Sequence, residues 1–366
     1  MDSVEVSLLT CSPHEEIYSL YGHSAIRWHD MSGSGVDTLV EDVVFNWGVF
    51  DFRKPYFVPR FVFGLTDYEL GAYPFEFFWP YYKQFGSSVI EQVLNLTNEE
   101  KWRLKEILSE NLRPENKVYR YNYFYDNCST RPRDIIEKCI SGKVEYAQRE
   151  DYTPSYRDMV HACARNHPWA KFGNDILLGI KADMKTSLRE QEFLPENLMY
   201  DFDRAQIYAD GEYRPLVKER RVVVPPGVQI IEQDFPLSPV QCAIILLAIG
   251  LIIFILEYRE RRTFMVWDVL LMVVTGIIGI VLTLMLFSQH PTVNLNLQFL
   301  FFNPLPWFFL WPVIKGKNTR YWSITAVLCL CFFIGSLFQN YAEGIWSLAL
   351  CLLLQCISHL THKREK

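Results

Sequence analysis

The hydrophobic and polar positions divide this chain into two parts of different character. Up to about residue 235, short apolar stretches alternate with polar residues and are punctuated by proline, glycine and aspartate, as in a folded globular domain. From Leu237 onward, apolar runs follow one another, each near the ~20 residues that a bilayer requires. We predict five membrane spans, at 237–256, 264–287, 297–314, 321–338 and 344–360. The sequence therefore predicts an exported domain at residues 1–235 and a helical transmembrane domain at 236–366.

The sequence also predicts a break in the third span and the secondary structure of the exported domain. The third span contains Asn303 and three prolines, which is typical of a broken or re-entrant helix. In the first part, alternation predicts strands at 4–10, 19–28, 43–50, 87–96, 118–125 and 219–224. Thr97 and Glu100 form a capping-box start for a helix that runs to about residue 112, and a second helix should follow Cys128. This mixture predicts an α+β exported domain.

The loops between the spans differ in charge. Basic residues follow the first, third and fifth spans: Arg259, Arg261, Arg262, Lys315, Lys317, Arg320, Lys363, Arg364 and Lys366. The other two loops, 288–296 and 339–343, contain no lysine or arginine. By the positive-inside rule the C-terminus is cytoplasmic and residues 1–235 lie outside. Residues 1–3 carry no basic segment of an export signal, so we expect the sequence to begin at a mature N-terminus.

Charge and cysteine usage exclude some classes of function. The formal net charge is −6, and no basic cluster suggests nucleic-acid binding. Five of the nine cysteines lie in the predicted spans, where small side chains are ordinary packing residues. The other four have no zinc-like spacing. We therefore expect no metal and no cofactor.

The segment Tyr125-Asp126-Asn127-Cys128-Ser129-Thr130 is the strongest candidate for chemistry. It leads from an aromatic strand into a helix, and a thiol at a helix N-terminus is favoured as thiolate. The backbone amide of Cys128 and those of its neighbours at the helix start would supply oxyanion donors. His23, in Tyr21-Gly22-His23-Ser24, is the best candidate base. Each residue alone has a simpler interpretation, as a buried small side chain or an ordinary strand histidine.

A third member follows from strand geometry. If a hairpin turns near residues 35–36, His23 lies opposite about Gly48, and even-numbered neighbours share its face. Asn46 is then placed to orient the imidazole, whereas Asp51 is the alternative with the wrong parity. Asn46 as a simple turn cap fits equally well. Arg27, Ser129 and Arg131 are candidate substrate-binding residues, and an arginine near the helix start suits either an ion pair or a phosphate headgroup.

Four motifs together resemble the Lnb family of lipoprotein N-acyltransferases from Gram-negative envelopes: Leu8-Leu9-Thr10-Cys11-Ser12-Pro13, Tyr21-Gly22-His23-Ser24-Ala25-Ile26-Arg27, Asn46-Trp47-Gly48-Val49-Phe50-Asp51-Phe52 and Asp126-Asn127-Cys128-Ser129-Thr130-Arg131. The order of histidine before cysteine also resembles permuted papain-like domains of the NlpC/P60 and lecithin:retinol acyltransferase kind. The resemblance implies such a fold for the exported domain, with Cys128 as acyl-accepting nucleophile and His23 as base.

The function implied is transfer of a fatty acyl chain from a phospholipid, through a thioester, to the α-amine of a diacylated lipoprotein at the bacterial inner membrane. The aromatic segments 56–63 and 73–85 would form an acyl-binding surface or simply core. Two alternatives stay open. One is a membrane-tethered NlpC/P60-like cell-wall peptidase or amidase, and the other is a non-catalytic lipoprotein-binding factor in which Cys128 is structural.

Overall fold

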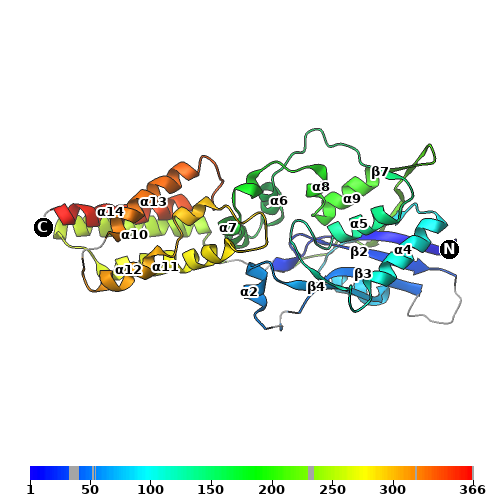
Figure 1. The fold of residues 1–366 in the computed structure, drawn as a ribbon, viewed down its shortest axis with the longest axis horizontal. Helices are drawn as coiled ribbons and strands as arrows, with labels where there is room; N and C mark the ends of the chain where they lie inside the picture. The colour runs from blue at the N-terminus through cyan, green and yellow to red at the C-terminus, as the bar shows by residue number, and fades with distance from the viewer. Residues whose placement is uncertain (33–40, 52, 54, 230–234, 318–319, 365–366) are drawn as a thin grey trace. The chain divides into compact units, whose positions relative to one another are not determined.

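The computed structural model of the protein describes residues 1–32, 41–51, 53, 55–229, 235–317 and 320–364. The expected turn near residues 35–36 and Lys366 lie outside them, as do residues 230–234 just before the predicted domain boundary. The chain forms two compact units (Figure 1). The first comprises Met1–Pro154 and Lys185–Glu232, and the second comprises Ser155–Met184 and Gln233–Lys366.

A seven-stranded antiparallel sheet organises the first unit, in the order β10-β5-β1-β2-β3-β4-β6. Its strands are β1 (Val4–Cys11), β2 (His23–Asp30), β3 (Asp42–Val49), β4 (Asp67–Pro74), β5 (Val89–Leu94), β6 (Val118–Arg120) and β10 (Val217–Val224). A small second sheet contains β7 (Lys143–Glu145), β8 (Gln206–Ala209) and β9 (Glu212–Pro215). Six of the seven strands in the large sheet overlap predicted ones.

Two strand predictions were too long. The strand expected at 19–28 begins only at His23, because η1 (Ile17–Ser19) and Gly22, with φ +75°, form a turn before it. A side chain at Gly22 would also meet the Cys11 carbonyl oxygen at 2.8 Å. The strand expected at 118–125 ends at Arg120, because the chain then folds back at a bridge between Asn122 and Asp126.

Helices cover both faces of the large sheet. Apolar side chains of α4 (Asn98–Asn111), α5 (Thr130–Cys139) and α9 (Pro195–Arg204) pack against Leu8 and Ile26 on one face. Those of α3 (Phe75–Gln84) pack against Leu9 and Ala25 on the other. The remaining helices of this unit are α2 (Phe57–Val62) and α8 (Leu188–Gln191). The capping box of Thr97 and Glu100 begins α4 as predicted. Because Leu8 and Leu9 point to opposite faces of the sheet, β1 contributes side chains to the hydrophobic core on each face.

The second unit is helical. It contains α6 (Tyr156–Cys163), α7 (Pro168–Leu177), η2 (Ile180–Asp183), α10 (Pro239–Glu260), α11 (Met265–Met285), η3 (Leu297–Leu300), α12 (Leu305–Ile314), α13 (Tyr321–Gly335) and α14 (Ile345–Arg364). Among the described residues, four segments are long and apolar enough to cross a membrane: Pro239–Glu260, Met265–Met285, Leu297–Ile314 and Ile345–His362. The fourth predicted span is the shorter apolar helix α13. An α+β domain followed by a helical membrane region confirms the predicted fold class.

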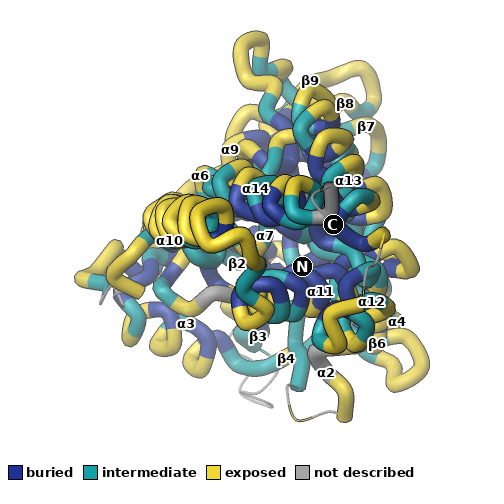
Figure 2. Tube along the Cα trace, turned by 90° about the vertical axis from the view of Figure 1, so that its left-hand side faces the viewer, coloured by how far each residue is buried: buried dark blue, intermediate teal, exposed yellow. Residues whose placement is uncertain are grey.

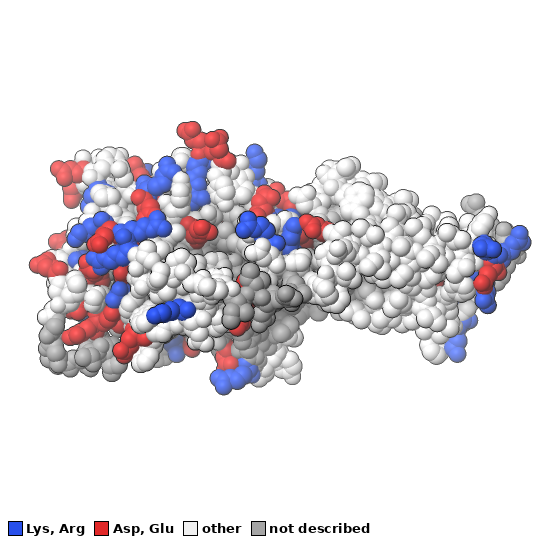
Figure 3. Space-filling view, turned by 180° about the vertical axis from the view of Figure 1, so that it is seen from behind, with Lys and Arg blue, Asp and Glu red and all other residues white. Residues whose placement is uncertain are grey.

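The surfaces of the membrane helices fit a lipid environment. Figure 2 shows α10 exposed along most of its length, and its outward side chains include Ile244, Ile252 and Ile255. Figure 3 shows charged side chains gathered at the far end of the helical region, with uncharged atoms along its length. Exposed apolar side chains on this scale are stable only against lipid.

The third span is broken, as its prolines predicted. The chain leaves η3 at Leu300 and begins α12 only at Leu305, whose amide donates to Asn303 Oδ1 at 3.1 Å. A side chain at Gly279 of α11 would meet the Asn303 backbone at 2.2 Å. The glycine therefore allows the broken segment to pack directly against α11.

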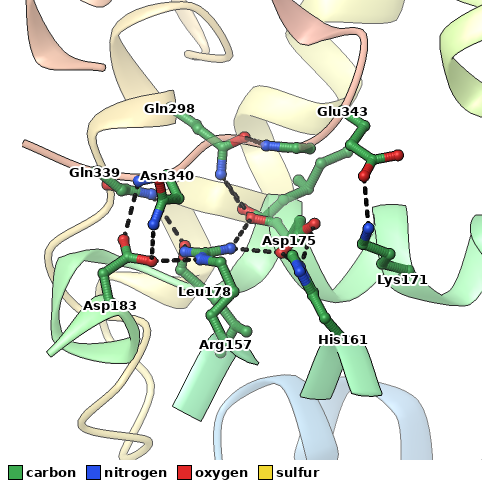
Figure 4. A network of polar contacts seen from close by, with 12 residues as sticks. Arg157, His161, Lys171, Asp175, Leu178, Asp183, Gln298, Gln339, Asn340 and Glu343 are labelled. Carbon is green, nitrogen blue, oxygen red and sulfur yellow. Dashed lines mark hydrogen bonds and ion pairs between the residues drawn. The ribbon is translucent and has the colours of Figure 1, made fainter. Parts of the chain in front are cut away.

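A buried polar network joins residues 155–184 to the membrane helices within the second unit (Figure 4). The Arg157 guanidinium, only 2% exposed, donates to Asp175 Oδ1 and Asp183 Oδ1, each at 2.6 Å. Gln298 donates to the Asp175 carbonyl at 2.7 Å, and Gln339 donates to the Leu178 carbonyl at 3.0 Å. Because these groups are buried, the network depends on every partner being present.

Candidate active site

His23 and Asn46 meet at the junction of β2 and β3. Ile26 pairs with Phe45 and Arg27 with Val44, and continuing this register places His23 opposite Gly48, as the parity argument predicted. His23 Nε2 lies 2.6 Å from Asn46 Oδ1. Because an amide oxygen only accepts, Nε2 carries the proton in this contact.

The Asn46 side chain is itself held in place. Its Nδ2 donates to the Tyr73 hydroxyl at 2.6 Å, which fixes the amide with its oxygen toward His23. Tyr73 lies on β4, the strand next to β3, and its ring packs near Phe78 of α3 at 6.3 Å between centroids. Burial raises the pKa of Tyr73 to about 12, so its hydroxyl stays neutral. A second layer of residues therefore orients the imidazole.

Cys128 lies just before α5, and its loop is shaped by Asn127. Asn127 Oδ1 accepts from the amides of Ser129 at 2.9 Å and Thr130 at 3.0 Å, while the Thr130 hydroxyl accepts from the Asn127 amide at 2.8 Å. These bonds cap the helix start. Of the amides expected to supply oxyanion donors, those of Ser129 and Thr130 are therefore already occupied. Within the described residues, the Cys128 amide has no acceptor, and it is the available donor at this position.

The thiol and the imidazole shift each other's pKa. Burial raises the pKa of Cys128, but His23, the Ser24 amide and the Ser129 hydroxyl outweigh it and lower the pKa below its usual range. Burial lowers the pKa of His23, but the Cys128 thiolate and the bonds with Cys128 and Asn46 raise it above its usual value. Both shifts favour a thiolate–imidazolium pair. Cys128 as a residue is half-buried.

Gly48 completes the site and was not singled out by sequence reasoning. It lies at an irregularity of the β3–β4 pairing with φ +122°, a conformation that favours glycine. A β-carbon at this position would lie 3.7 Å from His23 Cε1 and 3.8 Å from Cys128 Cβ. A side chain here would therefore contact both reacting groups, and the positive φ is what favours glycine. The Asn46-Trp47-Gly48 sequence was the available signal, since a glycine inside a strand indicates a bulge or a close approach.

The three predicted substrate-binding residues are engaged within the protein. Arg27 donates twice to Asp42 at 2.7 Å and once to Glu91 at 2.9 Å. Ser129 is fully buried, and its hydroxyl lies 3.1 Å from that of Ser24. These contacts favour structural roles for Arg27 and Ser129, and substrate contact by either stays a prediction.

Arg131 and Asp51 also form ion pairs within the protein. Arg131 forms two hydrogen bonds with Asp126, at 2.6 and 2.8 Å, and lies 3.7 Å above the Tyr119 ring. Of the two uses foreseen for an arginine near the helix start, the geometry favours the ion pair. Asp51, the alternative to Asn46, accepts from Arg53 at 3.0 Å.

Among the described residues, no group of three or more histidine, cysteine, aspartate or glutamate side chains is arranged to hold a metal ion. All nine cysteines are free thiols. What the residues offer is therefore nucleophilic chemistry: an activated thiol, an oriented imidazole that can move a proton, and one backbone donor.

Comparison with known families matches both parts of the chain. The Lnb N-terminal periplasmic domain matches residues 1–162, a range that contains His23, Asn46, Gly48 and Cys128. The Lnb transmembrane domain matches residues 230–366. No curated protein and no solved structure matches the chain. Since the two matched ranges follow the order of its two parts and together include most of its length, the protein is a membrane protein of the Lnb family, a membership that supports a lipoprotein-modifying, acyltransferase-like role.

Proposed function

We propose that the protein is a cysteine-dependent lipoprotein N-acyltransferase that takes a fatty acyl chain from a phospholipid. The observation that carries this proposal is the Cys128–His23–Asn46 series, in a half-buried site of the exported domain of an Lnb-family membrane protein. Thiols activated in this way form acyl intermediates. Both substrates of the reaction are held in the membrane by lipid chains, which explains why the catalytic domain is joined to membrane helices.

In the first step the Cys128 thiolate attacks the carbonyl carbon of a phospholipid ester. The Cys128 amide donates to the developing oxyanion. The bond between the carbonyl carbon and the glycerol oxygen breaks, and the His23 imidazolium gives its proton to that oxygen. A lysophospholipid leaves, and Cys128 carries the acyl chain as a thioester.

In the second step the α-amine of a diacylglyceryl-cysteine lipoprotein attacks the thioester carbonyl. The carbon–sulfur bond breaks, His23 accepts a proton from the amine, and the thiolate is restored. Asn46 keeps the imidazole oriented through both steps. The reaction consumes no nucleotide, because the energy of the ester is carried forward in the thioester. We place this chemistry on the outer face of the bacterial inner membrane, with the C-terminus in the cytoplasm, on the basis of the loop charges.

Mass spectrometry of a lipoprotein tests the proposal in cells that lack other N-acyltransferases. The wild-type chain should add one acyl chain to the lipoprotein, and Cys128→Ala and Cys128→Ser should not. Cys163→Ser is the matched control, since this second half-buried thiol lies outside the site. In the purified protein, labelled phospholipid should yield an acyl-enzyme on Cys128 that hydroxylamine removes. Unchanged N-acylation by Cys128→Ala would end the proposal, and release of stem peptides from peptidoglycan would favour the peptidase instead.

A further inference from the structure

A buried segment far along the chain from Cys128 contacts the protein on both sides of that residue. The segment 189–193 contains the end of α8 and the two residues that follow it. Glu192 is 0% exposed and Phe193 is 2% exposed. One of them contacts the residue immediately before Cys128, and the other contacts α5 shortly after it. The two contacts therefore hold the loop of the nucleophile from outside the site.

Asn127, the residue before Cys128, is held by the backbone of this segment. Its Nδ2 donates to the Phe193 carbonyl at 2.9 Å and to the Tyr123 carbonyl at 2.9 Å. The Phe193 ring also meets the Phe124 ring edge-on, with 5.0 Å between centroids. Because two carbonyls fix the nitrogen of the Asn127 amide, its oxygen stays directed toward the backbone amides that begin α5.

Arg133, on α5 shortly after Cys128, is held by the side chain of Glu192. Its Nη1 donates to Glu192 Oε2 and to the Arg189 carbonyl, each at 2.9 Å, and its Nε donates to Asp134 at 2.8 Å. Among the described residues, Arg133 is the only hydrogen-bond donor to the Glu192 carboxylate, whose other oxygen has no partner. Arg189 also donates to Asp134 at 2.6 Å, which joins α8 to α5 (Figure 1). Since a charge left alone in the interior is costly, the two side chains fix each other.

We propose that Glu192 is a positioning residue for Cys128, and that it acts by fixing Arg133 and with it the start of α5. Phe193, the next residue, fixes Asn127 on the other side of the sulfur. The direction of a cysteine side chain depends on its backbone, and a displacement of about 1 Å can cost about 100-fold in rate. This inference rests on the proposed function. Glu192 itself touches none of the reacting groups.

The test follows a single turnover of acylation in the full-length protein in nanodiscs, over a range of phospholipid concentrations. Burial raises the pKa of Glu192 to about 7 against the opposing charge of Arg133, so the assay is run at about pH 8, where the carboxylate is ionised. The test variant is Glu192→Gln. The matched control is Glu100→Gln, which also removes a carboxylate that is 0% exposed and paired, in this case with Arg214 at 2.6 and 2.7 Å. Glu100 accepts from the Ser141 amide, after the C-terminal end of α5.

We expect Glu192→Gln to lower the maximal acylation rate about 10- to 100-fold, and to leave the half-saturating phospholipid concentration within about twofold. Glu100→Gln should leave both values within about twofold, although it also removes a buried charge. Equal maximal rates in the two variants would overturn the inference. Arg133→Lys keeps a positive charge beside Glu192 but loses the planar fork, so it should lower the maximal rate about threefold. If Glu192→Gln does not fold, Arg133→Lys decides, and an unchanged rate in that variant would overturn the inference.

Hydrogen exchange gives a second measurement that requires no substrate. The amides of Ser129 and Thr130 are protected by their bonds to Asn127 Oδ1. The peptide that carries them should exchange about tenfold faster in Glu192→Gln than in the unaltered protein, and at an unchanged rate in Glu100→Gln. Equal exchange of this peptide in both variants would contradict the inference. If the unaltered protein forms no acyl-enzyme, the proposed function fails while the exchange still tests the contact, so the two failures are distinguishable.

Discussion

Replacing Asn46 with alanine removes the acceptor that lies 2.6 Å from His23 Nε2. The bond is strongest when His23 is an imidazolium, and hydrogen bonds to charged groups contribute about 1.5–3 kcal/mol. Since each 1.36 kcal/mol changes a rate tenfold, acylation of Cys128 should slow by roughly 10- to 150-fold. The pKa of His23 should fall at the same time, because the Asn46 bond is one of the contacts that raise it.

A graded series separates this orienting role from general damage to the site. Tyr73→Phe removes the hydroxyl that accepts from Asn46 Nδ2, and leaves the Asn46 side chain in place. Because that bond is between neutral groups, its loss should cost about 0.5–1.5 kcal/mol, or roughly 2- to 12-fold in rate. Asp51→Asn is the control, because Asp51 pairs with Arg53 instead.

The assay follows alkylation of Cys128 by iodoacetamide across pH, together with acyl-enzyme formation from phospholipid. Asn46→Ala should shift the upper limb of the alkylation profile to lower pH, because the imidazolium then deprotonates earlier. Tyr73→Phe should fall between wild type and Asn46→Ala in both measurements. The reasoning is refuted if Asn46→Ala and Asp51→Asn have the same alkylation profile and acylation rate. It is also refuted if Tyr73→Phe is acylated more slowly than Asn46→Ala.

Three further predictions test other parts of the structure. The lowered pKa of Cys128 means that its thiolate persists at pH values below the usual range for a thiol. Alkylation should therefore stay fast at neutral pH and decline only as the pH falls through that pKa. An alkylation rate that depends on pH as that of an ordinary cysteine does would contradict the thiolate–imidazolium pair. Gly48→Ala should destabilise the protein by about 1–3 kcal/mol, because a φ of +122° strains any residue other than glycine. It should also slow acylation, because the added methyl group would lie 3.7 Å from His23 Cε1. Thermal unfolding measures the first effect, and the acylation rate measures the second. Arg157→Met should cost about 3–5 kcal/mol, because it removes the buried guanidinium that Asp175 and Asp183 share. Lys171→Met, at a more exposed ion pair, should cost about 1 kcal/mol or less. Unfolding of both variants in detergent measures the difference.

The part of the site that local geometry determines could be predicted from the sequence. Because side chains alternate along a strand and β2 and β3 form a hairpin, the parity of positions 23 and 46 was enough to place His23 and Asn46 on one face. The proline-rich segment after residue 303 was enough to predict a broken helix. Both inferences use only one segment or two segments that follow one another along the chain.

Contacts between distant segments were outside the reach of such reasoning. Arg27 shares the face of His23 by parity, yet its guanidinium is held by Asp42 and by Glu91, which lies 64 residues away. Nothing in the alternation of β2 could reveal that β5 brings Glu91 alongside. The segment 155–184 is a second case: its sequence is polar like that of the exported domain, but Gln298 and Gln339 donate to its backbone carbonyls and bind it within the membrane unit.

At the start of α5, the side chain of Asn127 determines which backbone amides are available. The helix N-terminus favours a thiolate at Cys128, as the sequence indicated, but the field of a helix is not the same as an available donor. Asn127 occupies the amides of Ser129 and Thr130, which leaves the Cys128 amide to face an oxyanion. Removing one oxyanion donor typically costs about 10²–10³ in rate. Under the proposed mechanism, Asn127 holds the loop through two amides and the Cys128 amide is the remaining donor, so Asn127→Ala should disturb the position of Cys128 before it adds any useful donor.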